Sequence, residues 1–389
     1  MAASVRPCRI LAVLCLAVCL VSGCGRPDAP ELRLGFVATF SGEGFRAGRD
    51  ALDAARFAVE TATREGRPVL GGRACRIRLF VRDDKASPEG AARAVRDLVT
   101  RERVAAIIGP YTSETADAAA LAAETAGVPL VTPSATAETV TAGRPHIFRI
   151  AFTNDFEGTV LARVALQGLH AKRVAVLSDR DDLASRSLAR AFIRTVTACG
   201  GQARLFAYAD RERDFQPILR QALAMAPDVL FLPNPSKDVV LQGLAARKLG
   251  FRGALLGGDA WDGPEISGLA AFAGALFVDH WRADLPGKRS QAYAAAFRQA
   301  RDRPATELGA LTQDAVDVVL LAVARARSTA PAAVTRELMA MPPFDGVTGR
   351  FDFVEDGNPV KSLFLTRVTD GGTRLDTMAV PPPEPCPSR

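Results

Sequence analysis

Two hydroxyl-rich stretches, Gly109-Pro110-Tyr111-Thr112-Ser113 and Thr132-Pro133-Ser134-Ala135-Thr136, each follow directly on a short apolar run, at residues 104–108 and 127–131. Short apolar runs that end in turn residues are typical of buried strands. Ligands of open α/β sheets bind beyond the carboxyl ends of such strands. Hydroxyl groups and the free amides of a helix N-terminus can bind a small anionic group there without any catalytic residue. The two stretches therefore predict a ligand-binding site.

Similar apolar runs alternate with amphipathic segments along most of the chain, at residues 32–38, 77–81, 173–177, 229–232 and 254–256. Ser87-Pro88-Glu89 has the hydroxyl cap and the early proline that are typical of a helix start. Strands that alternate with helices predict βαβ units and parallel sheets covered on both faces. Several runs are continuously apolar, as strands buried on both faces should be. The predicted fold class is therefore α/β with doubly wound parallel sheets.

The first 24 residues resemble the signal sequence of a bacterial lipoprotein. Arg6 and Arg9 precede an apolar run at residues 10–21, which is too short to span a bilayer as a helix. The run ends at Val21-Ser22-Gly23-Cys24, which is similar to a lipobox. The resemblance implies a cleaved signal peptide (residues 1–23), a lipid anchor on Cys24, and a location in the periplasm or at the cell surface. An ordinary secretory signal that contains a cysteine is the alternative.

About 365 residues remain from Cys24 onward, which is too many for one core and suits two domains. The strand series breaks near Phe148-Arg149-Ile150-Ala151, and a second series begins at Lys172. The net charge is +6, or +4 without Arg6 and Arg9. Because the arginines are interspersed with acidic residues, no nucleic-acid partner is predicted.

The cysteines and histidines show no metal-ligand spacing. Cys75, Cys199 and Cys386 are the cysteines that follow residue 24, and no CxxC pair occurs among them. An oxidising compartment permits one disulfide, whose pairing stays open. The histidines lie far apart in the sequence, at His146, His170 and His280. We therefore predict neither a metal nor a cofactor.

Catalytic motifs are also missing. Gly42-Glu43-Gly44-Phe45-Arg46-Ala47 fits the G-x-G-x-x-A turn of dinucleotide-binding enzymes. However, Asp83 and Asp84 lie about 40 positions later, whereas such enzymes place an acidic residue about 20 positions on. No G-x-S-x-G, Walker A or HExxH motif occurs. The sequence predicts a binding protein rather than an enzyme.

The segments that follow the predicted strands carry a family resemblance. They are Phe40-Ser41-Gly42, residues 109–113, residues 132–136, Gly257-Gly258-Asp259 and residues 344–353. In this order and spacing, the chain resembles the type I periplasmic solute-binding proteins of the leucine/isoleucine/valine-binding group, the receptors of branched-chain amino acid ABC transporters. The resemblance covers most of the mature chain and implies two doubly wound lobes joined by a three-crossover hinge.

The resemblance also implies the domain boundaries. Residues 24–31 form a linker after the lipidated cysteine, and residues 381–389 form a proline-rich tail. Lobe one takes residues 32–150 and 283–347, and lobe two takes residues 151–282 and 348–380. The two lobes are expected to close over a ligand in the cleft between them.

Positions that match the family motifs give a ligand site. By this comparison, the Ser113 hydroxyl and Thr136 bind the α-carboxylate of the ligand. Ser134 offers its backbone carbonyl to the α-ammonium, next to Ala135, and Asp259 neutralises that ammonium from the opposite lobe. A carboxylate is favoured at a helix N-terminus, and a desolvated ammonium needs a carboxylate and further acceptors.

Each position also has a purely structural interpretation. Thr112 or Ser113 could cap a helix that begins near Glu114, and residues 132–134 could form an ordinary turn. Asp259 could be a surface turn residue. The family resemblance favours ligand contact.

The side-chain pocket departs from the family pattern. Ala47 replaces a common aromatic residue, Asp182-Leu183-Ala184 replaces Asp-Tyr-Gly, and Pro233-Asn234-Pro235-Ser236 replaces a Gly-Gly-aromatic turn. Specificity for leucine therefore does not follow from the resemblance. Leu183, Tyr111 and Trp261 are candidate pocket walls, with a core or rim position as the alternative for the two aromatic residues.

These observations predict an extracytoplasmic lipoprotein that captures an amino acid or a similar small polar solute and delivers it to an ABC transporter permease. Membrane contact is expected through the lipid anchor only. The same fold also serves as sensory or orphan ligand-binding lipoproteins, and as interaction lipoproteins that activate peptidoglycan synthases. The combination of Ser113, Thr136 and Asp259 favours small-molecule binding over protein contact.

Overall fold

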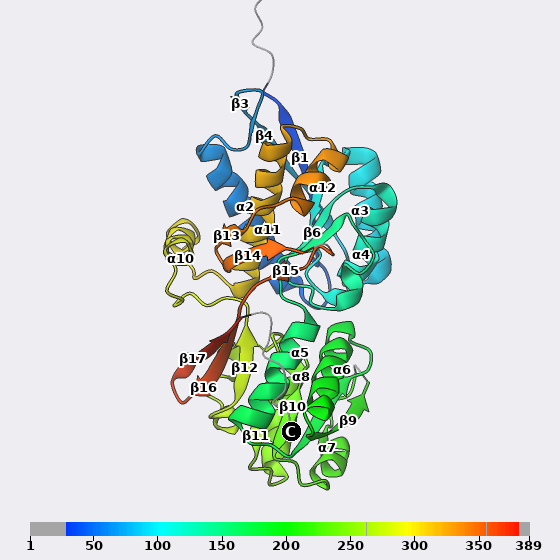
Figure 1. Ribbon diagram of the computed structural model, residues 1–389, viewed down its shortest axis with the longest axis vertical. Coiled ribbons are helices and arrows are strands. Elements are labelled where there is room, and N and C mark those ends of the chain that lie inside the picture. Colours follow the sequence, from blue (N-terminus) through cyan, green and yellow to red (C-terminus); the bar gives the residue numbers. More distant parts are fainter. Residues whose placement is uncertain (1–28, 210, 262, 355, 381–389) are drawn as a thin grey trace, which may run out of the picture.

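The computed structural model describes residues 29–380 except 210, 262 and 355. The chain forms two α/β lobes that lie one above the other along the long axis of the molecule (Figure 1). Each lobe is built around its own sheet, with helices on both faces. This arrangement confirms the fold class predicted from the sequence.

Lobe one surrounds a five-stranded parallel sheet with the strand order β4-β1-β5-β6-β7. Its strands are β1 (Glu31–Ala38), β4 (Arg76–Asp83), β5 (Ala106–Ile108), β6 (Leu130–Thr132) and β7 (Ile147–Arg149). Its helices are α2 (Phe45–Arg64), α3 (Pro88–Asp97), α4 (Ser113–Ala126), α10 (Lys288–Arg301), α11 (Glu307–Ala326) and α12 (Pro331–Met339). Phe36 packs in the apolar cluster with α2 and α11, and Val37 in the cluster with α3 and α4. Both faces of β1 are therefore buried.

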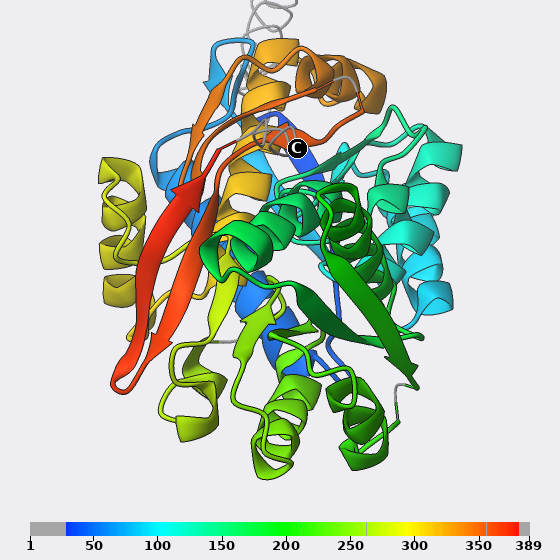
Figure 2. The same cartoon turned by 60° about the horizontal axis from the view of Figure 1, so that its bottom comes forward.

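Lobe two surrounds a seven-stranded sheet with the order β17-β16-β12-β11-β10-β8-β9. Its strands are β8 (Arg173–Asp179), β9 (Gln202–Tyr208), β10 (Val229–Leu232), β11 (Ala254–Gly257), β12 (Leu276–Asp279), β16 (Leu363–Thr369) and β17 (Gly372–Ala379). Its helices are α5 (Asn154–Arg163), α6 (Leu183–Ala198), α7 (Gln216–Leu223), α8 (Ser236–Lys248) and α9 (Gly263–Ile266). The strands β8 to β12 run parallel, and the β16–β17 hairpin extends the sheet antiparallel beyond β12 (Figure 2).

Shorter elements complete the described chain. Two small sheets contain β2 (Val69–Leu70), β3 (Arg73–Ala74), β13 (Phe344–Gly346), β14 (Gly349–Phe353) and β15 (Pro359–Val360). The single turns of π- or 3₁₀-helix are η1 (Leu98–Glu102), η2 (Glu138–Val140), η3 (Val164–Gly168) and η4 (Ala270–Phe272).

The apolar runs predicted as strands all overlap strands of the two main sheets, and residues 229–232 coincide with β10. Among the strands of the two main sheets, the sequence missed β7, β9, β12 and the β16–β17 hairpin. Because β9 and β17 lie at the two edges of the sheet and expose much of their length, they lack a continuous apolar run. β12 is buried but only four residues long.

The chain passes between the lobes three times: between β7 and α5, between β12 and α10, and between β15 and β16. The third passage comes later than the sequence placed it. Phe351 and Phe353 of β14 pack in the core of lobe one, because β14 pairs with β13. Residues 349–353 therefore belong with lobe one, and the boundary expected after residue 347 lies after residue 360.

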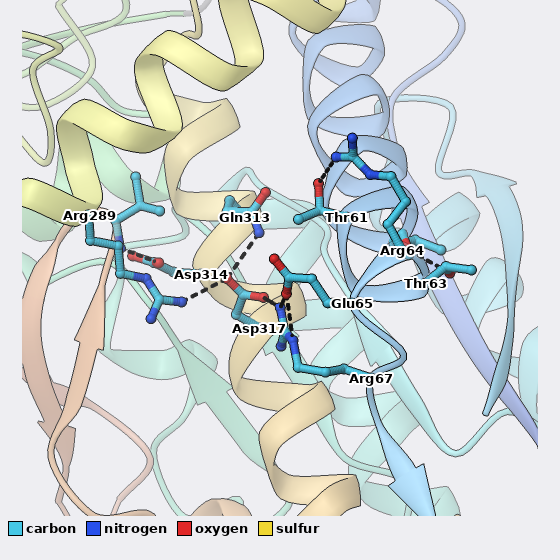
Figure 3. A network of polar contacts seen from close by, with 11 residues as sticks. Thr61, Thr63, Arg64, Glu65, Arg67, Arg289, Gln313, Asp314 and Asp317 are labelled. Atoms are coloured by element: carbon cyan, nitrogen blue, oxygen red, sulfur yellow. Dashed lines mark hydrogen bonds and ion pairs between the residues drawn. The ribbon is translucent and has the colours of Figure 1, made fainter. Parts of the chain in front are cut away.

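A polar network joins three helices of lobe one (Figure 3). The Asp317 carboxylate of α11 is largely buried and accepts hydrogen bonds from Arg289 Nη2 of α10 at 3.1 Å and from Gln313 Nε2 at 3.0 Å. Nη2 of Arg67, just beyond α2, lies 4.0 Å from Asp317 Oδ1 and 2.7 Å from Glu65 Oε2. These contacts fix α10 and the end of α2 against α11.

Candidate functional site

The two hydroxyl-rich stretches lie side by side and are bonded to each other. Thr132 Oγ1 donates to the carbonyl oxygen of Pro110 at 2.5 Å, and Ser134 Oγ donates to that of Tyr111 at 2.9 Å. The backbone N–H of Ala137 donates to Ser113 Oγ at 3.2 Å. The parallel pairing of β5 with β6 brings the two strand ends together. The structure thus joins the two stretches at the carboxyl ends of β5 and β6, where the rule for open α/β sheets places a ligand site.

Ser113 begins helix α4, and its hydroxyl does not cap that helix. The capping position belongs to Thr112, which makes no side-chain capping bond; its hydroxyl instead lies 2.7 Å from Thr115 Oγ1. Since Ser113 Oγ accepts from Ala137, its hydroxyl hydrogen remains to be donated. A hydroxyl donor next to the free amides of a helix N-terminus suits a carboxylate.

The second stretch is held from behind by a buried arginine and by the start of α5. Arg149, which is fully buried, donates from Nη1 to the carbonyl oxygen of Ala135 at 2.9 Å. The N–H of Asn154 donates to the carbonyl oxygen of Thr136 at 3.0 Å. Within the described residues, no donor reaches the carbonyl oxygen of Ser134 and no partner reaches the Thr136 hydroxyl. These two groups remain available to a ligand.

Asp259 follows β11 in lobe two and keeps part of its carboxylate exposed, with 14% of the side chain accessible. Its Oδ2 lies 3.1 Å from His280 Nε2, and its backbone N–H donates to Glu157 Oε1 at 2.9 Å. A Cβ on Gly258, just before it, would lie 2.5 Å from Leu188 Cδ2 and 2.8 Å from Glu157 Oε1, so both side chains would have to shift. Tight packing therefore fixes the backbone of Asp259.

The first turn of α5 brings the halves of the site from the two lobes together. Its Asn154 N–H contacts the Thr136 carbonyl of lobe one, and its Glu157 carboxylate contacts the Asp259 N–H of lobe two. Figure 1 shows α5 at the junction between the lobes. The predicted carboxylate-binding and ammonium-binding groups thus flank the same helix start.

Carboxylates of lobe one also contact helix starts of lobe two. Glu114 accepts a hydrogen bond from the N–H of Leu183, at the start of α6. Glu138 accepts from the Asp155 N–H at 2.6 Å and from the Ser187 hydroxyl. The N-terminus of a helix favours negative charge, so these contacts stabilise the arrangement in which the two lobes touch each other.

The three candidate pocket walls lie in different surroundings. The Tyr111 hydroxyl donates to the carbonyl oxygen of Gly44 at 2.9 Å. The two residues lie so close that a Cβ on Gly44 would be 2.6 Å from the Tyr111 hydroxyl oxygen. Leu183 packs against an apolar cluster of lobe one. Trp261 is 2% exposed and donates from Nε1 to the carbonyl oxygen of Leu232 at 2.9 Å. Of the two alternatives for Trp261, the structure has the core position.

Sequence reasoning missed a group of buried charged residues behind Asp259. Burial raises the pKa of Glu157 well above its ordinary value, and the charge of Asp259 raises it further. Burial also raises the pKa of Glu307, with the charge of Asp279 adding to the effect. Burial lowers the pKa of Lys361 to about 8. No sequence motif marks these residues, which meet only because the lobe connections converge.

The structure describes only some of the predicted cysteine, metal and membrane features. The predicted signal peptide at residues 1–23, Cys24 and Cys386 lie outside the described residues. Cys199 is disulfide-bonded, and Cys75 is a free, buried thiol. Among the described residues, no cluster of His, Cys, Asp or Glu could hold a metal ion, and no helix is both long and apolar enough to cross a membrane.

Comparison with known proteins gives the family. The profile of the family described as periplasmic binding protein matches residues 31–373. The chain therefore belongs to this family.

Relatives and solved structures agree with this assignment. The Leu/Ile/Val-binding protein BraC3 of Rhizobium johnstonii is 24% identical over 340 residues, which cover 86% of this chain and 90% of the relative. The leucine-binding protein LivK of Thermotoga maritima superimposes with a TM-score of 0.83 at 29% identity, over 90% of this chain and 99% of that one. A solute-binding protein of R. palustris in complex with benzoate shares the fold, with a TM-score of 0.79 and 22% identity over 90% and 97% of the two chains. The chain is a solute-binding protein rather than an enzyme.

Proposed function

We propose that this protein binds an α-amino acid, or a similar small polar solute, between its lobes and delivers it to an ABC transporter permease. The observation that carries the proposal is the pairing of hydroxyl and amide donors at the start of α4 with the Asp259 carboxylate of the other lobe. Thr136 and Asp259 both contact the first turn of α5, through the N–H of Asn154 and the carboxylate of Glu157. An α-amino acid presents the complementary carboxylate and ammonium.

The lobe-one half suits the carboxylate of the ligand. Ser113 donates its remaining hydroxyl hydrogen, the amides at the start of α4 add their partial positive charge, and Thr136 offers a second hydroxyl. Arg149, buried behind Ala135, adds a positive charge nearby. Burial lowers its pKa to about 10, which leaves the guanidinium charged at neutral pH.

The ammonium half separates amino acids from simple aromatic acids. The free carbonyl of Ser134 and the carboxylate of Asp259 would surround an ammonium with acceptors. A ligand such as benzoate has no cationic group and would leave Asp259 desolvated without a counter-charge. The site therefore favours a ligand that bears an ammonium, although a benzoate-binding protein shares the fold.

The proposal places the protein outside the cytoplasm, held to a membrane by a lipid on Cys24. The support is the lipobox-like sequence at residues 21–24 and the membership of a periplasmic binding protein family. The anchor is tested by incorporation of labelled palmitate into the protein expressed from the full-length sequence, compared with a Cys24→Ser variant. Label that persists in the variant would contradict it.

A thermal-shift panel tests the ligand class. The mature chain with Cys24→Ser is screened against α-amino acids, the corresponding deamino acids and amides, and benzoate. We expect at least one α-amino acid to raise the melting temperature in proportion to the logarithm of its concentration above the Kd, while its deamino acid and its amide do not. Stabilisation by benzoate and by deamino acids alone, or by no amino acid, would refute the proposed class.

The affinity should also depend on pH through Asp182, the residue that caps α6. Burial, together with the charge of Glu114 from lobe one, raises the pKa of Asp182 to about 7. Separation of the lobes removes Glu114, so the pKa of Asp182 is higher in the closed form than in the open form. The resulting stabilisation of the closed form is greatest at acidic pH and is lost as the pH rises through about 7.

We therefore expect weaker ligand binding at pH 8 than at pH 5.5 through this group, by up to about tenfold for each unit by which closure raises its pKa. Asp182→Asn, which keeps the capping oxygen, should remove most of that pH dependence. Calorimetric titrations of both proteins at the two pH values check this expectation. An identical pH profile for the variant would rule out Asp182 as its source.

A further inference from the structure

The carboxylate of Asp259 is held in place by a buried histidine. His280 Nε2 lies 3.1 Å from Asp259 Oδ2, and His280 is 2% exposed. The second carboxylate oxygen of Asp259 accepts no hydrogen bond from the described residues, and 14% of the side chain stays accessible. One oxygen is thus tied to the histidine and the other is left for a ligand.

His280 is itself fixed by the connections between the lobes. It directly follows β12, in the second passage of the chain from one lobe to the other. Its imidazole stacks on Phe152 of the first passage, with the ring centres 3.7 Å apart and an interplanar angle of 29°. Its backbone N–H donates at 2.6 Å to Glu307 Oε1, at the start of α11 in lobe one. The ring therefore has little freedom to turn.

The imidazole orients Asp259 without cancelling its charge. Burial lowers the pKa of His280, and the hydrogen bond and charge of Asp259 only partly oppose this effect. The nearby ammonium of Lys361 lowers the pKa further. A neutral imidazole donates one N–H from Nε2 and leaves the carboxylate negative. The negative charge of Asp259 therefore remains available for a cationic group of the ligand.

We propose that His280 is a positioning residue: its Nε2–H hydrogen bond aims the Asp259 carboxylate at the ammonium of the ligand and ties that contact to the hinge. This inference rests on the proposed function. The sequence indicates no functional role for His280, since it lies far from the other histidines and has no metal-ligand spacing. Its role follows from the 3.1 Å contact and from the stacking on Phe152.

A double-mutant cycle tests the inference with the amino acid that the thermal-shift panel identifies. His280→Phe keeps a ring to stack on Phe152 and keeps the backbone N–H to Glu307, so it removes chiefly the bond to Asp259. We expect it to weaken binding about tenfold, the usual effect of losing a hydrogen bond to a charged group. In an Asp259→Asn background the same substitution should weaken binding less than twofold, because residues that act through one another are not additive.

Two further variants separate positioning from general damage. His280→Gln retains an N–H donor and should recover most of the affinity that His280→Phe loses. His146→Phe removes a histidine that lies 2.9 Å from Glu124 in lobe one and should leave the affinity unchanged. Melting temperatures of the ligand-free variants show whether each one is folded.

The outcomes distinguish this inference from the proposed function. If Asp259→Asn does not weaken binding, the proposed ammonium site itself fails. If Asp259→Asn weakens binding but His280→Phe does not, or if the two effects add fully, only the role of His280 is overturned. Loss of affinity in His280→Gln equal to that in His280→Phe would also overturn it.

Discussion

Asp259→Asn is expected to lower the affinity for the bound amino acid by about 30-fold or more, since truncating one partner of a desolvated charge pair costs about 2–5 kcal/mol. Asparagine has the same shape, so the variant retains the packing around Gly258 and the backbone bond to Glu157. What it removes is the negative charge that offsets the ammonium. Calorimetric titration of the wild type and the variant with the same ligand measures the effect.

The matched control for this prediction is Asp370→Asn. Asp370 lies in the exposed turn between β16 and β17, and the same change there should alter the affinity by less than twofold. A reduction below about fivefold for Asp259→Asn would show that Asp259 does not meet an ammonium, because even a single charge-assisted hydrogen bond contributes more than that.

Asp314→Ala is expected to lower the free energy of unfolding by about 3–5 kcal/mol, the usual cost of leaving a buried charge without the opposite charge that compensates it. Asp314 of α11 is fully buried and accepts hydrogen bonds from the N–H groups of Val347 and Thr348, at 2.6 and 2.9 Å, and from the Thr348 hydroxyl at 2.6 Å. The same hydroxyl accepts from Lys361 Nζ at 2.6 Å. Alanine would leave these donors and the buried ammonium without their carboxylate.

Urea unfolding of the ligand-free protein measures this loss, and a second substitution identifies its origin. Lys361→Met removes the stranded ammonium, so the Asp314→Ala/Lys361→Met protein should be more stable than Asp314→Ala alone. A loss of less than about 1 kcal/mol in Asp314→Ala, or no recovery in the double variant, would mean that the pair contributes little to the stability of the hinge.

The sequence predicted most, though not all, of the strands that bury both of their faces, with β7 and β12 among the exceptions. Continuous apolar runs identified strands such as β10, and the turn residues after β5 and β6 marked the edge where the site lies. These signals are local, because a strand buried on both faces needs an unbroken apolar segment. Edge strands lack that signal, and β9 and β17 were missed for this reason.

The rest of the site could not be predicted because it depends on tertiary contacts. His280, in the second connection between the lobes, contacts Asp259 across 21 residues of sequence. Glu157, on α5, contacts it across 102 residues. Trp261 follows the same glycine turn as Asp259, yet its ring packs against Phe272 and Phe277 in the core of lobe two. Residue type alone does not distinguish a pocket wall from a core aromatic.

The contacts between the lobes also give a physical account of closure. Glu114 and Glu138 of lobe one place carboxylates at the starts of α6 and α5, where the amides of lobe two are unpaired within their own helices. A ligand that bridges Ser113 and Asp259 would add to these contacts only when the lobes meet. Its differential affinity for the closed form would then shift the equilibrium toward closure.

A high-resolution crystal structure of the protein with the amino acid that the panel identifies tests the proposed binding mode directly. We expect density for the ligand between the lobes, with its carboxylate within hydrogen-bond distance of Ser113 Oγ and Thr136, and its ammonium at Asp259 and the Ser134 carbonyl. A ligand bound elsewhere, or one that leaves Asp259 without a cationic partner, would refute this binding mode.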